Sequence, residues 1–137
     1  MNPTLLSLLG FIAWFLVLTY ALAFWRVRVS VSVGKPINSY APDGADLPGF
    51  GHRLTRARDN CFETLPVFVA IAFAASASGE LDMLDGLAPW LLLSRLIQSL
   101  IHLISTSSPA VVARATMLTV QLVIYSYWVV GLLFLGP

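Results

Sequence analysis

The sequence predicts an all-α membrane protein built from four transmembrane helices. Hydrophobic residues make up 58% of the chain and charged residues only 11%, whereas soluble domains carry about 25% charged residues. The mean hydropathy is +0.81. With 137 residues, the chain has room for roughly four segments of the ~20 apolar residues that span a bilayer. A single membrane domain over residues 1–137 therefore accounts for the whole length.

The first apolar segment, at about residues 5–25, contains no charged residue. It ends at Phe24 and Trp25, and aromatic residues of this kind gather where the membrane meets water. The segment is too long for the apolar core of a secretory signal peptide, and no basic stretch precedes it. We therefore expect a transmembrane helix that stays in the protein and is not cleaved off as a signal peptide.

A long polar connection follows, at about residues 26–55. Turn-forming residues mark it at positions 38–44 and 47–49. Its opening stretch, residues 26–33, alternates between polar residues and valine. This period of two fits a strand, but a frayed extension of the first helix fits equally well, and the sequence leaves both alternatives open.

Three further helices are expected at about residues 57–78, 88–105 and 109–135. Pro66 interrupts the first of these and should kink it unless neighbouring helices satisfy the freed carbonyl. A short acidic connection over residues 79–87 leads to the next helix. Ser107, Ser108 and Pro109 supply a capping serine followed by proline at the start of the last helix.

The basic residues gather around the first connection. Six of the eight lysines and arginines flank or occupy it, and the connection 79–87 has none. The six are Arg26, Arg28, Lys35, Arg53, Arg56 and Arg58. The positive-inside rule therefore places the first loop in the cytoplasm and both termini on the non-cytoplasmic side. The net charge of +1 gives no basic field that would favour a nucleic-acid partner.

Polar side chains recur at helical spacing on one face of each of the last three predicted helices. The stripes are Arg53, Arg56, Asn60 and Glu63; Arg95, Ser99 and His102, with Gln98 at the edge; and Arg114, Gln121 and Tyr125. An ionisable residue inside a span costs at least ~2.5–3.5 kcal/mol on insertion scales. We therefore expect the stripes to meet in the cytoplasmic half, with Glu63 and Arg95 inside the protein.

The stripes hold more arginines than carboxylates. This surplus suits an anionic ligand bearing carboxylates, which arginine binds bidentately. An alternative is that the groups only pair with each other, Glu63 neutralising Arg95 and Asn60 bonding a neighbouring helix. Near the surface, basic side chains can instead reach membrane lipid phosphates; these are Arg26, Arg28, Lys35, Arg53 and Arg58. The single cysteine, Cys61, excludes an intrachain disulfide and is assigned no role.

The segment that enters the second predicted helix, residues 53–68, resembles the signature of the MAPEG family, the membrane-associated proteins in eicosanoid and glutathione metabolism. The family pattern is approximately R-A-x-x-N-x-x-E-x-x-P. It is matched here by Arg56, Ala57, Asn60, Glu63 and Pro66. Helix number, chain length and a cytoplasmic first loop also agree, so the resemblance covers essentially the whole chain.

This resemblance implies a left-handed four-helix bundle assembled as a homotrimer, with the co-substrate glutathione bound between subunits near the cytoplasmic face and no metal. The family's lipophilic second substrate would arrive from the membrane. Arg114 would stabilise the glutathione thiolate. The residues that would bind the tripeptide are Arg26, Arg56, Asn60, Glu63, Arg95, Gln98 and His102.

The chain departs from the family pattern near the expected site of chemistry. His102 stands where well-studied members carry a tyrosine, Ala115 where some carry a serine, and Leu118 where a tyrosine can occur. These departures keep a second hypothesis open, a non-catalytic membrane protein with the same fold. A small four-helix transporter is a third hypothesis; the uncharged first helix and the arginine stripes disfavour it.

Overall fold

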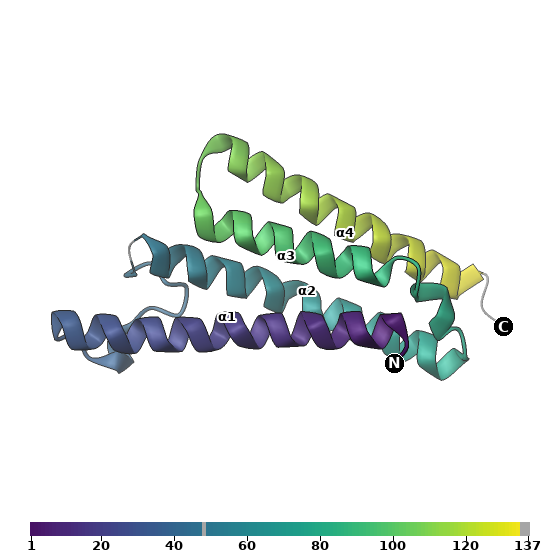
Figure 1. The fold of residues 1–137 in the computed structure, drawn as a ribbon, viewed down its shortest axis with the longest axis horizontal. Coiled ribbons are helices and arrows are strands. Elements are labelled where there is room, and N and C mark those ends of the chain that lie inside the picture. The colour runs from purple at the N-terminus through teal and green to yellow at the C-terminus, as the bar shows by residue number, and fades with distance from the viewer. Residues whose placement is uncertain (48, 135–137) are drawn as a thin grey trace.

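The computed structural model describes residues 1–47 and 49–134 (Figure 1). Over these residues the chain is helical throughout its regular structure, with four α-helices and two short 3-10 helices. The elements are α1 (Pro3–Val33), η1 (Ile37–Ser39), α2 (Phe50–Ser78), η2 (Leu81–Leu84), α3 (Ala88–Ile104) and α4 (Ser108–Phe134). The predicted four-helix bundle is confirmed.

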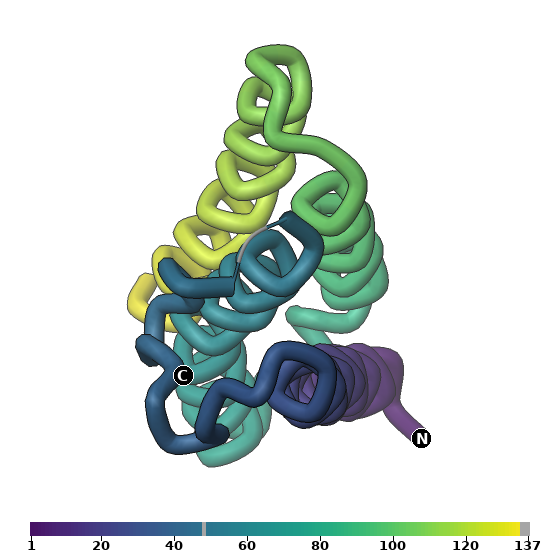
Figure 2. Tube along the Cα trace, turned by 90° about the vertical axis from the view of Figure 1, so that its left-hand side faces the viewer, coloured from purple at the N-terminus to yellow at the C-terminus, as the bar shows by residue number. Residues whose placement is uncertain are grey.

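The helices form a bundle in which α2 and α3 lie between α1 and α4 (Figure 2). Helix α1 packs against α2 and α3, while α4 packs against α3 and α2. The connections 34–47 and 105–107 are both at the same end of the bundle, called here the loop end (Figure 1). The N-terminus and η2 lie at the opposite end, called here the terminal end (Figure 1).

Helices α1, α2 and α4 are long and apolar enough to cross a membrane. At 1.5 Å per residue, the 31 residues of α1 extend about 46 Å, well beyond the ~30 Å hydrocarbon core. Helix α3 is shorter, with 17 residues, or about 26 Å. It runs between the two ends of the bundle (Figure 1). That α3 completes a fourth crossing stays a prediction.

The first two helices are longer than predicted, and the first loop is shorter. Helix α1 continues past Trp25 to Val33, so the alternating stretch is a helical extension and not a strand. It ends at Gly34, whose φ of 71° lies in the left-handed region that favours glycine. Helix α2 begins at Phe50. The predicted end of the last helix at residue 135 lies outside the described residues.

The centre of the bundle is an aromatic cluster drawn from three helices. Phe68 of α2 stacks on Trp128 of α4 with ring centroids 5.7 Å apart, and Phe11 of α1 meets Phe68 edge-on at 6.2 Å. Tyr125 lies 6.2 Å from Trp128. Buried aromatic pairs add to the stability supplied by burial alone, so this cluster fixes α1, α2 and α4 around a common point.

The start of α1 is tied to η2 at the terminal end. Asn2 caps the helix, its side chain accepting the backbone N–H of Thr4 at 2.8 Å. Its amide donates to Asp85 at 2.9 Å, and the Thr4 hydroxyl donates to Asp85 at 2.6 Å. The acidic connection therefore holds the N-terminus in place.

The first loop is closed by an ion pair. Lys35 Nζ lies 2.5 Å from an Asp46 carboxylate oxygen, and that carboxylate also accepts the backbone N–H of Ala41. The Lys35 hydrogen bond holds the pKa of Asp46 below its ordinary value. Where the loop returns, Gly51 approaches Trp25 so closely that a Cβ would lie 2.8 Å from the indole nitrogen.

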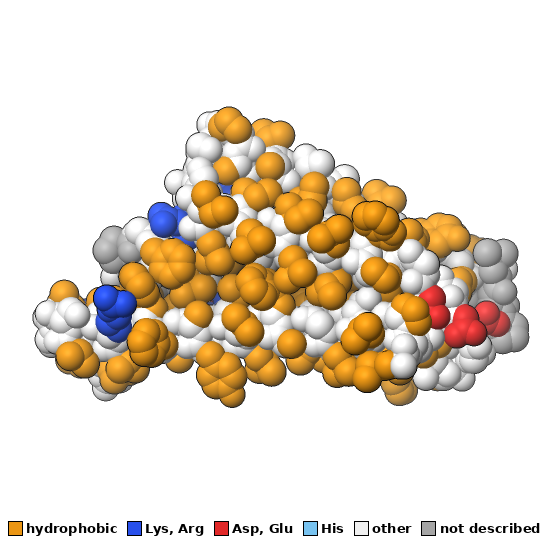
Figure 3. Space-filling model, in the orientation of Figure 1, with side chains coloured by type: hydrophobic (Ala, Val, Ile, Leu, Met, Phe, Trp, Pro, Cys, Tyr) orange, Lys and Arg blue, Asp and Glu red, His pale blue; other side chains and the backbone are white. Residues whose placement is uncertain are grey.

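The face of the chain seen in Figure 3 is largely apolar along the helices. Basic side chains are seen at the loop end of this face and acidic side chains at the terminal end (Figure 3). An apolar belt between two charged ends is the surface expected of a chain in a bilayer. Large exposed apolar side chains include Tyr20, Phe24, Phe62, Phe73, Trp90 and Phe134.

Candidate functional site

Arg95 of α3 lies at the centre of a polar network that reaches all four helices. Its side chain is 0% exposed. Nη2 donates to the Thr64 hydroxyl of α2 at 2.6 Å and to the side-chain oxygen of Gln121 in α4. The guanidinium carbon lies 5.4 Å from the centroid of the Phe11 ring in α1, within cation–π range. The prediction that Arg95 lies inside the protein is confirmed.

The network continues to Gln98, one turn along α3. The Gln121 amide donates to the Gln98 side-chain oxygen at 2.9 Å, and both residues are buried. Arg95 and Gln98 are thus enclosed by their own chain. A ligand can reach either residue only if these contacts open.

His102 lies at the centre of a second polar cluster, nearer the loop end. The Asn60 side-chain nitrogen of α2 lies 2.8 Å from His102 Nε2, and Arg114 Nη1 of α4 lies 2.7 Å from His102 Nδ1. His102 is 6% exposed, whereas Arg114 is half-buried. The three predicted stripes therefore do meet, and Asn60 bonds a neighbouring helix as the pairing alternative expected.

Two other arginines lie at the same end. Arg53 Nε donates to the backbone carbonyl of Leu103 at 2.9 Å, which joins the start of α2 to the end of α3. Arg26 is half-buried, and its Nε and Nη2 atoms are shielded from solvent without a hydrogen-bond partner in the described part of the chain. Buried donors without an acceptor are costly, so Arg26 suits an anionic group.

Arg56 and Glu63 point away from the bundle. Both are exposed on the outer surface of α2, so the prediction that Glu63 lies inside the protein is wrong for the single chain. Among the described residues, no ion pair joins Glu63 to Arg95, and that part of the pairing alternative is wrong too. Helical spacing identified the correct helix but could not tell which neighbour covers its polar side chains.

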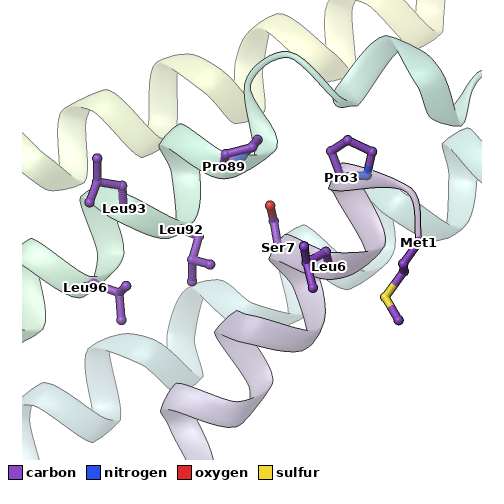
Figure 4. Close-up of a pocket in the computed structure, with 8 residues that line it drawn as sticks. All are labelled: Met1, Pro3, Leu6, Ser7, Pro89, Leu92, Leu93 and Leu96. Atoms are coloured by element: carbon purple, nitrogen blue, oxygen red, sulfur yellow. The ribbon is translucent and has the colours of Figure 1, made fainter.

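An apolar cavity of about 400 Å³ lies between the first turns of α1 and α3 (Figure 4). Its lining is Met1, Pro3, Leu6, Ser7, Pro89, Leu92, Leu93 and Leu96. None of the predicted site residues lines it. It lies toward the terminal end, away from His102 and Arg114, so its size does not make it the site.

A second hollow, of about 350 Å³, runs between α2 and α4 and borders the Arg95 network. Thr64 and Tyr125 line it, and the Tyr125 hydroxyl donates to the Thr64 carbonyl at 3.4 Å. The rest of the lining is Val67, Leu122, Ser126, Val129 and Val130. This hollow joins apolar surface to the polar interior.

Sequence reasoning missed Thr64, which accepts a hydrogen bond from Arg95. Its position four residues after Asn60 places it on the same helical face, and this spacing could have identified it. Cys61 is buried, with its sulfur 3.5 Å from the Ser99 hydroxyl. In residues 1–47 and 49–134, no three histidine, cysteine or acidic side chains come close enough to bind a metal ion.

The fold and the site define an integral membrane helix bundle with a polar interior at one end. The sequence matches the profile of the MAPEG family over residues 4–134, so this chain belongs to the MAPEG family, and the resemblance drawn from the Arg56–Pro66 motif is confirmed. Membership supports a membrane protein of eicosanoid or glutathione metabolism. No curated protein and no solved structure matches the chain.

Proposed function

We propose that this protein is a membrane-bound, glutathione-dependent enzyme of the transferase or peroxidase type. It activates the glutathione thiol for attack on a lipophilic electrophile. The observation that carries the proposal is Arg114, a half-buried cation held at the loop end by His102. Family membership supports glutathione as the co-substrate.

Glutathione carries carboxylates, an ammonium group and a thiol, and the half of the bundle nearer the loop end offers a partner for each. Arg56 and the unpartnered donors of Arg26 suit the carboxylates. Glu63 suits the ammonium group, and Asn60 adds a side-chain amide. Arg56 and Glu63 are exposed on the single chain, so a ligand can reach them. Arg95 and Gln98 contribute from beneath by fixing the helices that present these groups.

The working unit is a homotrimer whose glutathione sites lie between subunits. Support comes from Glu63, a carboxylate near the middle of α2 that one chain leaves exposed. Facing lipid there would cost at least ~2.5–3.5 kcal/mol, and a second copy together with bound glutathione removes that cost. The first loop lies in the cytoplasm and both termini on the other side, because the basic residues gather at the loop end.

The chemistry is electrostatic. A free thiol has a pKa of about 8.5, so at neutral pH most glutathione is unreactive. The Arg114 cation favours the thiolate without accepting the proton, which leaves to water. The lipophilic substrate arrives from the surrounding lipid. The thiolate attacks its electrophilic atom and forms a bond from sulfur, while the substrate's leaving group departs with the electron pair of the bond that breaks.

A second candidate is a non-catalytic membrane protein with the same fold. The enclosed positions of Arg95 and Gln98 favour it, because two predicted glutathione contacts are sealed by their own chain. Ala115 and Leu118 at the start of α4 also lack the hydroxyl groups found in some relatives of this family.

Turnover separates the two candidates. The purified protein in detergent is assayed for glutathione binding by calorimetry and for conjugation of chlorodinitrobenzene, with Arg114→Ala as the matched variant. The enzyme proposal expects binding by both proteins and conjugation by the wild type alone. If both proteins bind glutathione and neither conjugates chlorodinitrobenzene, the non-catalytic candidate is supported. If the wild type neither binds glutathione nor conjugates the substrate, glutathione is not the ligand.

A further inference from the structure

His102 joins three helices through its two ring nitrogens. Asn60 of α2 lies 2.8 Å from Nε2, and Arg114 of α4 lies 2.7 Å from Nδ1. Arg114 makes no other side-chain hydrogen bond within the described residues. The single fixed contact of the proposed activating cation is therefore the imidazole of His102.

The chemistry of the two partners determines which ring nitrogen carries the proton. Arginine only donates hydrogen bonds, so Nδ1 must accept from Arg114. A neutral imidazole has one acceptor nitrogen, and Nε2 must then carry the proton. Asn60 can match this by turning its amide oxygen toward Nε2. A charge-assisted hydrogen bond is about twice as strong as a neutral one. The bond to Arg114 therefore determines which ring nitrogen carries the proton, and the Asn60 side-chain amide turns to match it.

We propose that His102 is the residue that positions the Arg114 guanidinium for thiolate stabilisation, by accepting its Nη1–H at Nδ1. This inference rests on the proposed function. With one guanidinium nitrogen held by His102, the remaining donors of Arg114 are free to face the sulfur. His102 itself is 6% exposed with both nitrogens engaged, so it acts through Arg114 and not by touching glutathione.

Positioning matters because an arginine side chain is long and flexible. A free arginine has about 2 kcal/mol of rotamer entropy to lose when it is fixed. A held guanidinium has already lost part of that freedom before the thiol ionises, and preorganised charge is the form of electrostatic stabilisation that contributes most to catalysis. Asn60 lies against the other ring nitrogen, and turning its amide oxygen toward Nε2 gives up the bond that its Nδ2 donates to the Arg56 carbonyl at 3.0 Å.

A matched pair of variants tests the proposal. Leucine and asparagine have the same branched skeleton, so His102→Leu and His102→Asn leave the same space. Asparagine keeps an acceptor the same number of bonds from Cα as Nδ1, and leucine keeps none. We expect His102→Leu to lower the ionisation constant of the bound glutathione thiol about tenfold, which is one pKa unit. His102→Asn should recover a substantial part of that loss. Thiolate is read from ultraviolet absorbance and binding from calorimetry.

Thermal unfolding separates this role from simple packing. A buried asparagine without full hydrogen bonding is less stable than leucine, so His102→Asn should unfold more readily while giving more thiolate. In the Arg114→Ala background, His102→Leu should have no further effect on thiolate. The control is His52→Leu in the other histidine, which contacts the Gly44 carbonyl in the first loop and should leave the thiolate signal unchanged.

The outcomes are distinct. If the wild type forms thiolate and His102→Leu forms the same amount, the positioning role is wrong and the proposed function survives. The same holds if His102→Asn forms no more thiolate than His102→Leu. If the substitutions at His102 and Arg114 lower the thiolate signal independently, His102 acts by a route other than Arg114 and the inference falls. If wild type forms no thiolate, the proposed function fails and the inference fails with it.

Discussion

We expect Gln121→Leu to destabilise the bundle more than Arg95→Met, although both substitutions break the same hydrogen bond. Gln121→Leu leaves the Arg95 charge fully buried with only the Thr64 hydroxyl as acceptor. A hydrogen bond to a charged group contributes about 1.5–3 kcal/mol, and a buried charged donor left without its acceptor costs more than a neutral one. The substitution also removes the donor to the Gln98 side-chain oxygen. Arg95→Met removes the charge together with its desolvation penalty, and an unbranched methionine fills much of the space. It leaves one unpaired amide oxygen, at about 1–3 kcal/mol.

The assay is the unfolding of the detergent-solubilised protein, followed by circular dichroism as a denaturing detergent is added. The double variant Arg95→Met/Gln121→Leu should be more stable than Gln121→Leu alone, because no buried charge is left. The reasoning is refuted if Arg95→Met costs as much as Gln121→Leu, or if the double variant is the least stable of the three.

Three further predictions follow from contacts at the two ends and the outer face of the bundle. Asp46→Asn should speed hydrogen exchange of the first-loop backbone amides at neutral pH. The Lys35 hydrogen bond lowers the pKa of Asp46, so the protection of these amides in the wild type should be complete above about pH 3.9, the ordinary aspartate pKa. It should be lost as the pH falls through the lower pKa of the folded state. Asn2→Ala should cost about 1 kcal/mol of stability, measured by the same detergent unfolding, and an unchanged midpoint would show that the cap is unimportant. Glu63→Leu should alter the yield of crosslinked trimer, because Glu63 is exposed on one chain; equal trimer yield and equal glutathione affinity would show that no subunit or ligand covers this residue.

The sequence predicted the four helices well because their signals are local. Uncharged apolar segments and the Ser107–Pro109 start of α4 are readable without tertiary information; the Ser107 hydroxyl does accept the Ala110 N–H, at 3.4 Å. The end of α1 was harder to predict. Residues 26–33 alternate with period two, but residues 1–47 and 49–134 contain no strand that could pair with them. The helix already formed by the preceding residues therefore continues to Val33. The Ser30 hydroxyl then reaches Tyr40 across the loop at 3.2 Å.

The site could be predicted only in part, because a helical stripe shows a direction but not a neighbour. The stripes of α2, α3 and α4 correctly brought Asn60, His102 and Arg114 together. They could not show that Arg95 is sealed by Gln121, since that depends on how α4 packs. They also could not show that Glu63 faces outward, since α2 has polar residues on a face that a second chain can cover.

The central claim is that Arg114 stabilises the thiolate of bound glutathione. Its most direct test is the ultraviolet thiolate absorbance that appears on adding glutathione at neutral pH, compared between the wild type and Arg114→Ala, with binding followed by calorimetry. We predict a thiolate signal in the wild type that is lost in Arg114→Ala while binding persists, because the substitution leaves the contacts proposed for Arg26, Arg56 and Glu63 unchanged. A full thiolate signal in Arg114→Ala, or none in a wild type that binds glutathione, would contradict the claim.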